Sequence, residues 1–131
     1  MHTIIRSILF VVLACTITAQ AELVKAKGKG EIVYQGFFKI GQGSADERAA
    51  ILEAKKNALT RYAADFDSAR FELYKKIEPE VLANIDQYVT DYTQIDSQVD
   101  KSSKRYSVVI EASINTTLIE NAINKGAVLD N

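Results

Sequence analysis

Two Gly-x-Gly segments are the first features of the sequence that could support chemistry. Residues 28–30 (Gly-Lys-Gly) and 41–43 (Gly-Gln-Gly) offer flexible backbone, and the second segment lies between a predicted strand and a predicted helix. A phosphate-binding loop needs that context, because a helix N-terminus attracts anions. However, Asp46 replaces a third glycine, and Asp46 and Glu47 already place negative charge at the helix start. We therefore interpret both segments as turns.

Carboxylates recur along one predicted strand, at Asp86, Asp91, Asp96 and Asp100. Paired carboxylates can act as an acid–base pair or bind calcium, which requires oxygens gathered in a tight turn. At ~3.3 Å per residue these four carboxylates spread over roughly 45 Å of extended chain. This spacing favours a solvated strand face over a catalytic or metal site.

Hydroxyl groups do not form a catalytic pattern either. A serine nucleophile without a histidine base would need a lysine, but no Ser-x-x-Lys sequence occurs. Ser102 and Ser103 precede Lys104 at a predicted hairpin tip, where nothing would exclude water. The sequence therefore predicts a protein that is not an enzyme, has no catalytic or metal-binding residues and needs no cofactor.

The single cysteine and the single histidine both lie near the N-terminus, in a segment typical of a signal peptide. Arg6 precedes the apolar run 7–14, and residues 19–21 (Ala-Gln-Ala) form an A-x-A cleavage site. The run is shorter than the ~20 residues of a membrane span. We expect residues 1–21 to be a signal peptide, cleaved after Ala21, and the remaining protein to be periplasmic.

Cys15 leaves a second interpretation of the N-terminus open. Residues 12–15 (Val-Leu-Ala-Cys) resemble a bacterial lipobox, in which Cys15 would become the lipidated first residue. Leu13 is larger than the residue usual at its position. Membrane attachment is expected only in this alternative.

Cleavage after Ala21 would leave a chain without cysteine or histidine. Such a chain cannot form disulfides and has to be stabilised by its apolar core. Its formal net charge would be about −2, because Arg6 is removed. There is no surplus of positive charge for nucleic acid, which we do not expect as a partner.

The periodicity of the chain predicts a strand followed by a long helix. Residues 22–30 are read as a leader, either a solvated first strand or an arm, and residues 31–40 as a half-buried strand with period two. Ser44 and Glu47 form a capping box for a helix over residues 45–77, with Leu52 in its apolar stripe. A break near residues 65–68, with Asp67 or Ser68 as a new cap, is the alternative to one continuous helix.

The second half of the chain predicts a β-hairpin and a short helix. Pro79 should end the long helix and begin a short helical turn to residue 85. Residues 87–99 and 105–114 are predicted strands, the first with a bulge midway, joined by a turn at 100–104. A capping box at Thr117 and Glu120 should open a helix that ends at Gly126.

These elements predict an α+β domain: a two-layer sandwich of an antiparallel three-stranded sheet and helices. The domain would span residues 31–125, followed by a tail over residues 126–131. Three of the six tyrosines, Tyr34, Tyr62 and Tyr106, occupy core-type positions. The other three could be exposed and contact a partner protein or a glycan, but we favour packing in the core or the hairpin for them: Tyr74, Tyr88 and Tyr92.

The whole arrangement, over about residues 26–124, resembles a family of small bacterial envelope domains. The family includes the N-terminal domain of flagellar assembly protein T and small membrane-associated lipoproteins. The likeness lies in four segments: residues 28–31 (GKGE), the alanines at 50, 54 and 58, residues 84–92 (NIDQYVTDY) and residues 106–115 (YSVVIEASIN). These motifs are structural and bring no site residues.

The resemblance implies an exported, non-catalytic protein-interaction or assembly module of the envelope. Its partner would be an envelope protein or a second copy of the chain. With only one domain present, a flagellar role is not implied. The alternative is a periplasmic domain that binds a small ligand or glycan through exposed tyrosines.

Overall fold

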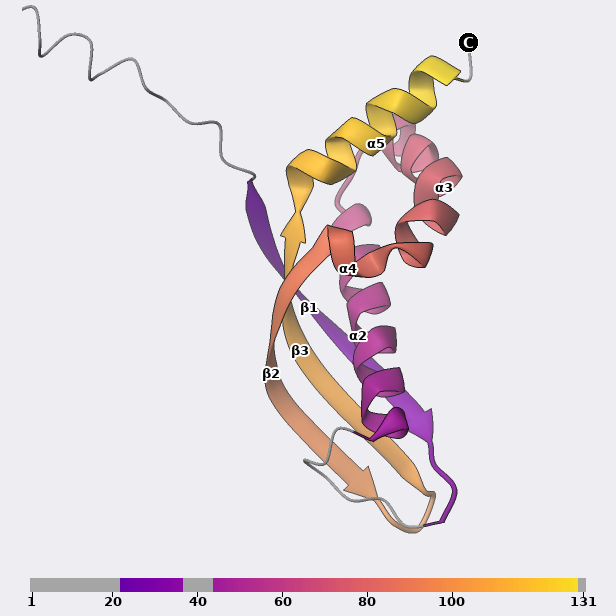
Figure 1. Ribbon diagram of the computed structural model, residues 1–131, viewed down its shortest axis with the longest axis vertical. Coiled ribbons are helices and arrows are strands. Elements are labelled where there is room, and N and C mark those ends of the chain that lie inside the picture. Colours follow the sequence, from indigo (N-terminus) through magenta and orange to yellow (C-terminus); the bar gives the residue numbers. More distant parts are fainter. Residues whose placement is uncertain (1–21, 37–43, 130–131) are drawn as a thin grey trace, which may run out of the picture.

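The computed structural model describes residues 22–36 and 44–129 (Figure 1). The predicted signal peptide, Cys15 and the glycine segment 41–43 lie outside the described residues. The order of elements is β1 (Leu23–Val33), α2 (Ala45–Ala63), α3 (Ser68–Ala83), α4 (Ile85–Tyr88), β2 (Val89–Asp100), β3 (Arg105–Asn115) and α5 (Thr116–Leu129).

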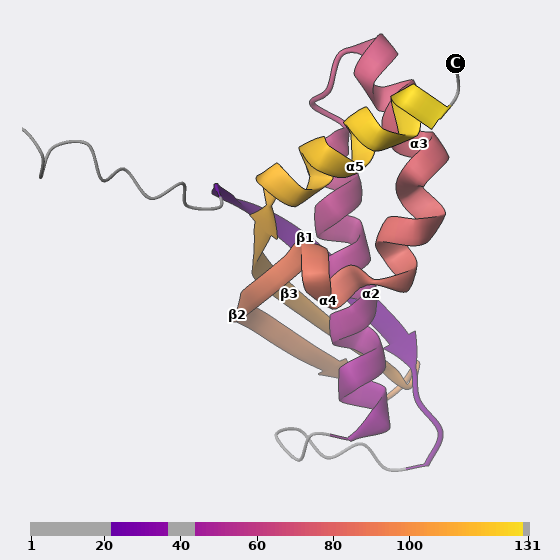
Figure 2. The same ribbon diagram turned by 45° about the horizontal axis from the view of Figure 1, so that its top comes forward.

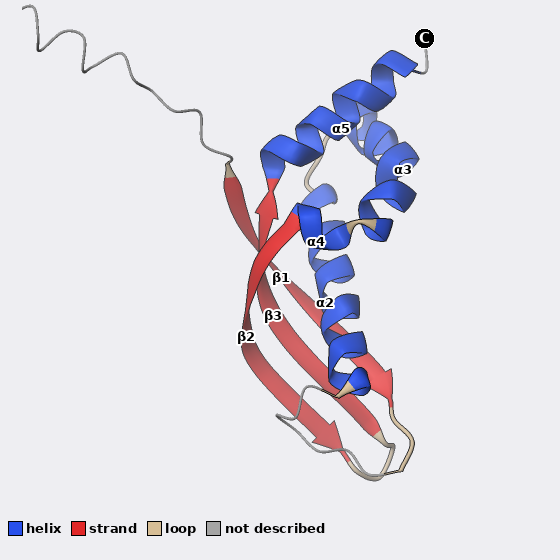
Figure 3. Ribbon diagram, viewed as in Figure 1, coloured by secondary structure: helices blue, strands red, loops and turns tan. Residues whose placement is uncertain are grey.

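The fold is the predicted α+β arrangement. The three strands form one antiparallel sheet in the order β1-β3-β2, so that β1 and β2 are both edge strands. The helices lie to one side of the strands (Figure 3). The core is formed between this helical layer and the inner face of β3, where Tyr106, Val108, Ile110, Ala112 and Ile114 are all buried.

The first strand begins much earlier than the sequence predicts. β1 runs from Leu23 to Val33, so the residues predicted as a leader supply most of the strand. The strand predicted over residues 31–40 ends at Val33, since residues 34–36 are not part of a strand. The inward positions of β1 include Gly28 and Gly30, which are buried and pair with Ile110 and Val108 of β3. Because glycines carry no side chain, the buried half of the strand gives no apolar alternation in the sequence.

Helix α2 packs on β1 at unusually short range. A Cβ on Gly28 would overlap the carbonyl oxygen of Ala54, and one on Gly30 would overlap that of Ala50. The buried face of α2 is correspondingly small, with alanines at 50, 54 and 58 followed by Leu59 and Ala63. Leu52, predicted in the buried stripe, is instead exposed.

The long helix is broken, as the alternative interpretation predicts. α2 ends at Ala63, and α3 begins at Ser68 with Asp67 as its N-cap. The carboxylate of Asp67 accepts a hydrogen bond from the amide of Arg70 at 2.8 Å. The predicted cap at the start of α2 is also confirmed, because the Ser44 hydroxyl accepts from the Glu47 amide at 3.2 Å.

Pro79 does not end a helix, contrary to the prediction. It lies inside α3, which continues to Ala83, and the next helical turn is α4. Proline removes one intrahelical hydrogen bond, which disfavours a helix interior. Here Tyr74 and Ile77 before Pro79 and Val81 after it are buried on the same helix. Their shared burial offsets the lost hydrogen bond.

The β-hairpin agrees with the sequence in its main features. β3 has strict alternation, and residues 101–104 form the turn. The predicted bulge in β2 is confirmed between Gln94 and Asp96, and a second irregularity lies between Val89 and Asp91.

The C-terminal helix differs from the prediction at both ends. α5 begins at Thr116, and its cap is the Asn115 side chain, which accepts from the Leu118 amide at 3.0 Å. Gly126 lies inside α5, which continues to Leu129. A Cβ at Gly126 would lie 2.9 Å from Cγ2 of Ile77, so the glycine allows close packing of α5 on α3 rather than ending the helix.

The start of the described chain is fixed to the junction of β3 and α5. The carbonyl of Glu22 accepts hydrogen bonds from the amide and the hydroxyl of Thr116, both at 3.0 Å. The amide of Glu22 donates to the Thr117 hydroxyl at 3.1 Å. Thr117 therefore serves this contact rather than the predicted capping box.

Candidate functional site

The three tyrosines predicted as contact residues differ in exposure. Tyr74 is 1% exposed and Tyr88 is 6% exposed, so both are core residues, whereas Tyr92 is 37% exposed. The structure therefore does not gather them into one aromatic surface. The core assignment of the other tyrosines is confirmed for Tyr34 and Tyr106, which are buried, and Tyr62 is half-buried.

Tyr74 is enclosed by the helical layer. Its ring packs edge-to-face on Phe66, with the ring centroids 5.9 Å apart. Its hydroxyl has no hydrogen-bond partner among the described residues. Burial raises the pKa of Tyr74 to about 12, and the nearby charge of Glu78 adds to this rise. These properties describe a packing residue rather than a contact with another molecule.

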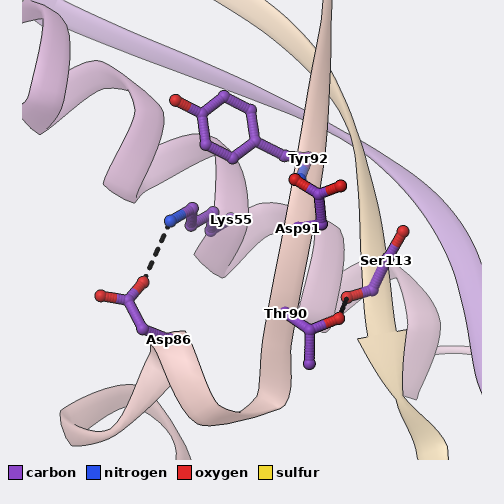
Figure 4. Close-up of polar contacts among 6 residues, drawn as sticks. All are labelled: Lys55, Asp86, Thr90, Asp91, Tyr92 and Ser113. Atoms are coloured by element: carbon purple, nitrogen blue, oxygen red, sulfur yellow. Dashed lines mark hydrogen bonds and ion pairs between the residues drawn. The ribbon is translucent and has the colours of Figure 1, made fainter.

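Tyr92 lies at the start of β2 and is held by α2 (Figure 4). The ammonium group of Lys55 lies 5.0 Å from the centroid of the Tyr92 ring. The same group forms an ion pair with Asp86 of α4, with Nζ and Oδ1 3.0 Å apart. Because a cation above an aromatic ring is attracted to it, Lys55 joins α2, α4 and β2 at this point.

A groove of about 290 Å³ separates α2 from the first residues of β2. Helix α2 packs over β1 and β3, to which the glycines of β1 admit it closely. Figure 2 shows β2 at the margin of the sheet, while β1 passes behind α2. The groove is lined by Arg48, Ile51, Leu52, Lys55, Asp86 and Tyr92.

Apolar side chains are exposed on both α2 and β2. Leu52 of α2 is 40% exposed, and Ile95, which lies in the bulge of β2, is 50% exposed. On the face that β2 shares with the core, Tyr92 and Gln94 are exposed although their β3 partners Ala112 and Ile110 are buried. The helical layer therefore leaves β2 partly uncovered. The sequence analysis did not single out Leu52 or Ile95 as surface residues.

The backbone of β2 also carries unusual hydrogen bonds. The Asp91 carboxylate accepts from the Tyr92 amide at 2.8 Å, and the Asp96 carboxylate accepts from the Ser97 amide at 2.9 Å. Two amides of this edge strand are thus bonded to side chains of their own strand. Exposed edges commonly carry such features, which limit unselective strand pairing.

The outer face of the sheet has opposite charges at its two edges. Lys25, Lys27 and Lys29 of β1 all lie on that face, because they alternate with inward-facing residues. Asp91 and Asp96 lie on the same face of β2. The shared pairing partners on β3 show which of these charges lie at the same position along the strand direction. Lys25 and Asp91 both pair with Ser113, and Lys29 and Asp96 both pair with Val109, so two of the three lysines are each level with one aspartate, whereas Lys27 is level with Thr93.

A larger cleft of about 560 Å³ lies among α3, α4 and α5. Its apolar lining includes Ile77, Tyr88 and Leu118, and its polar lining includes Glu80 and Lys125. Burial raises the pKa of Tyr88, and Glu80 adds to this effect, so its phenol remains neutral at physiological pH.

The remaining sequence candidates do not form a catalytic site in the described chain. The prediction of a turn at residues 28–30 is wrong, because these glycines lie within β1 and pack against α2. Asp86 belongs to α4, and Asp100 accepts hydrogen bonds from Ser102 and Ser103 in the hairpin turn. Within residues 22–36 and 44–129, no group of three or more His, Cys, Asp or Glu side chains could hold a metal ion.

None of the described helices is both long and apolar enough to cross a membrane. Comparison of the chain with protein-family models, with curated proteins and with solved structures found no significant match.

Proposed function

We propose that this protein is an exported, non-catalytic protein-interaction or assembly module of the bacterial envelope, which binds its partner along β2. One observation carries the proposal: β2 is an edge strand that α2 leaves partly uncovered. Such a strand can accept a further strand from a partner.

Strand addition at β2 would use two kinds of contact. Backbone groups at the free edge would pair with the partner strand, which provides affinity with little dependence on sequence. Partner side chains on the helical face would enter the groove beside Leu52 and Tyr92 and cover exposed apolar surface. This second contact supplies specificity, because the groove has a defined shape and charge.

The cellular location is part of the proposal. The signal-peptide pattern of residues 1–21 and the resemblance to small envelope domains support export to the periplasm, with cleavage after Ala21. Lipidation at Cys15 remains the alternative and would hold the domain at a membrane surface. Intact mass of the exported protein distinguishes a chain that begins at Glu22 from an acylated chain that begins at Cys15.

Site-specific photocrosslinking in cells tests the interaction surface. A photoreactive residue at position 95 should yield a recurrent adduct with one protein, either an envelope protein or a second copy of the chain. The matched control is position 128 on α5, where Val128 is also exposed. Adducts that are absent at position 95, or equally frequent at both positions, would contradict an interface at β2.

The cleft among α3, α4 and α5 favours a second candidate function, the binding of a small ligand or glycan. It combines the buried phenol ring of Tyr88 with polar groups at its rim. A ligand should raise the melting temperature, because it binds only the folded state. Leu118→Arg, which would fill the cleft, should abolish that rise. No rise with sugars, peptidoglycan fragments or lipids would exclude these classes.

A further inference from the structure

We infer that the partner strand for β2 is β1 of a second copy of this chain, so that copies join side by side in a continuous sheet. This inference rests on the proposed interface at β2 and identifies its occupant. It combines the charges of the two edge strands, their register through β3 and the position of α2.

The charges of the two edges are complementary. Within residues 22–36 and 44–129, Lys27 and Lys29 form no ion pair, and Lys25 is 3.8 Å from Glu111 with its side chain largely exposed. Among the described residues, the carboxylates of Asp91 and Asp96 bond only to amides of their own strand. Pairing two β1 edges or two β2 edges would oppose like charges, which destabilises a sheet, whereas pairing β1 with β2 joins opposite charges.

The direction of pairing follows from the topology. β1 and β2 are both antiparallel to β3, so they run in the same direction. A second copy that keeps its helices on the same side and places its β1 beside β2 must therefore add a parallel strand. Both charged rows then lie on the outer face of the joined sheet.

The lysines of β1 and the aspartates of β2 are already aligned along the strand direction. Lys25 is level with Asp91, and Lys29 is level with Asp96, because each pair shares a partner residue on β3. A copy displaced sideways by the width of the sheet brings its Lys25 beside Asp91 and its Lys29 beside Asp96. Each lysine would draw a carboxylate away from the amide that donates to it, and the amide of Tyr92, which is level with Ala26, is then free to pair with the added strand.

The helical layer fits the same arrangement. α2 lies over β1 of its own copy and leaves β2 partly uncovered. In the joined sheet, α2 of the added copy would lie beside the uncovered face of β2, next to the groove that contains Leu52. One backbone group of β1 already has a partner, since the carbonyl of Lys29 accepts from Asn57 at 2.6 Å. We therefore expect most of the backbone pairing N-terminal to Lys29.

Charge reversal tests the inference by sedimentation of the protein recovered from expression of the whole chain. The wild type should associate with rising concentration into species larger than dimers. Every assembly keeps an unpaired β1 at one end and an unpaired β2 at the other, so a further copy can always be added. High salt should weaken this association. Lys25→Glu with Lys29→Glu, and separately Asp91→Lys with Asp96→Lys, should each weaken association about tenfold or more.

The chain that carries all four reversals is the decisive variant. It again has opposite charges on its two edges, so it should associate as the wild type does, which also excludes misfolding of the two-site variants as the cause of their defect. Lys75→Glu with Lys125→Glu changes the net charge by the same amount on α3 and α5, away from both edges, and should leave association unchanged. A monomeric wild type, or a fourfold variant that does not regain association, would overturn the inference.

The outcome also separates this inference from the proposed function. A wild type that stays monomeric, but whose residue 95 crosslinks to another protein, retains the interface at β2 and loses only the assignment of its occupant. A monomeric wild type with no adduct at residue 95 would contradict both.

Discussion

Gly30 of β1 lies directly beneath Ala50 of α2, so close that a Cβ on the glycine would overlap the carbonyl oxygen of the alanine. Gly28 has the same relation to Ala54, one helical turn along α2. These two contacts fix α2 above one edge of the sheet. Because the helix lies there, β2 at the other edge is left with little helical cover.

Gly30→Ala should destabilise the domain by about 3 kcal/mol or more. Overpacking usually costs about 1–3 kcal/mol, and here the obstacle is helix backbone, which cannot change rotamer. Chemical denaturation would measure the loss. Lys27→Ala is the control on the exposed face of the same strand and should change stability by less than about 0.5 kcal/mol. Equal stability of the two variants would show that α2 can move away at little cost.

Tyr74→Phe should leave the domain equally stable or more stable, by up to about 1 kcal/mol. The hydroxyl that it removes is buried without a hydrogen-bond partner among the described residues, and burying such a group is unfavourable. Tyr74→Ala, which also removes the packed ring, should instead cost about 3–5 kcal/mol. A loss of more than about 1 kcal/mol in Tyr74→Phe would mean that the hydroxyl is well bonded.

Alkaline pH should destabilise the protein partly through Tyr74. Its pKa is raised to about 12 in the folded state, from an ordinary value of 10.0. Between these values the unfolded chain loses the proton and the folded chain keeps it, so stability falls as the pH rises from about 10 to about 12. The contribution is at most about 3 kcal/mol. Urea denaturation across this range should show a smaller decline in Tyr74→Phe, and identical declines would contradict the assignment.

Asp67→Ala should destabilise the domain by about 1 kcal/mol. It removes the carboxylate that accepts from the Arg70 amide at the start of α3. Asp65→Ala, in the same connection but outside the cap, is the matched control and should have little effect. If both substitutions cost the same, loss of negative charge rather than loss of the cap would be responsible.

Pro79→Ala should stabilise the domain by about 1–3 kcal/mol. Alanine restores an amide that can donate to the Lys75 carbonyl and removes the steric conflict of the ring with the preceding turn. Thermal unfolding would measure the gain. A lower melting temperature would indicate that α3 depends on a bend at Pro79.

Several elements could be predicted because their signals are local. Tyr106, Val108 and Ile110 alternate strictly along β3, and this pattern alone identifies a half-buried strand. The caps at Ser44 and Asp67 depend on residues three positions apart. The α+β class followed from these local signals.

The predictions that failed concern residues whose role depends on distant packing. The inward positions of β1 include glycines, and the buried stripe of α2 is largely alanine, so neither has the apolar contrast on which periodicity depends. Gly126 was read as a helix end, but it is a close contact with Ile77. In each case a neighbouring element, rather than local propensity, decides the outcome.

The candidate surface was predicted only in part. Tyr74 and Tyr88 are buried, as the favoured interpretation predicts, whereas Tyr92 is exposed. Their burial could not be established from the sequence, because it depends on how the helices pack on one another, whereas the exposure of Tyr92 depends on which strand α2 covers. The position of α2 depends in turn on two glycines whose importance appears only once the helix is seen above them.

The hydrogen bonds that hold Glu22 at the junction of β3 and α5 fix the point at which the described chain enters the domain. Residues before Glu22 join at one end of the sheet, and the turn at residues 101–104 lies at the other, about 35 Å away for strands of this length. Were the chain anchored through its N-terminus, the hairpin tip would point away from the anchoring surface. The two edge strands would then lie perpendicular to that surface and could pair with neighbouring molecules in its plane.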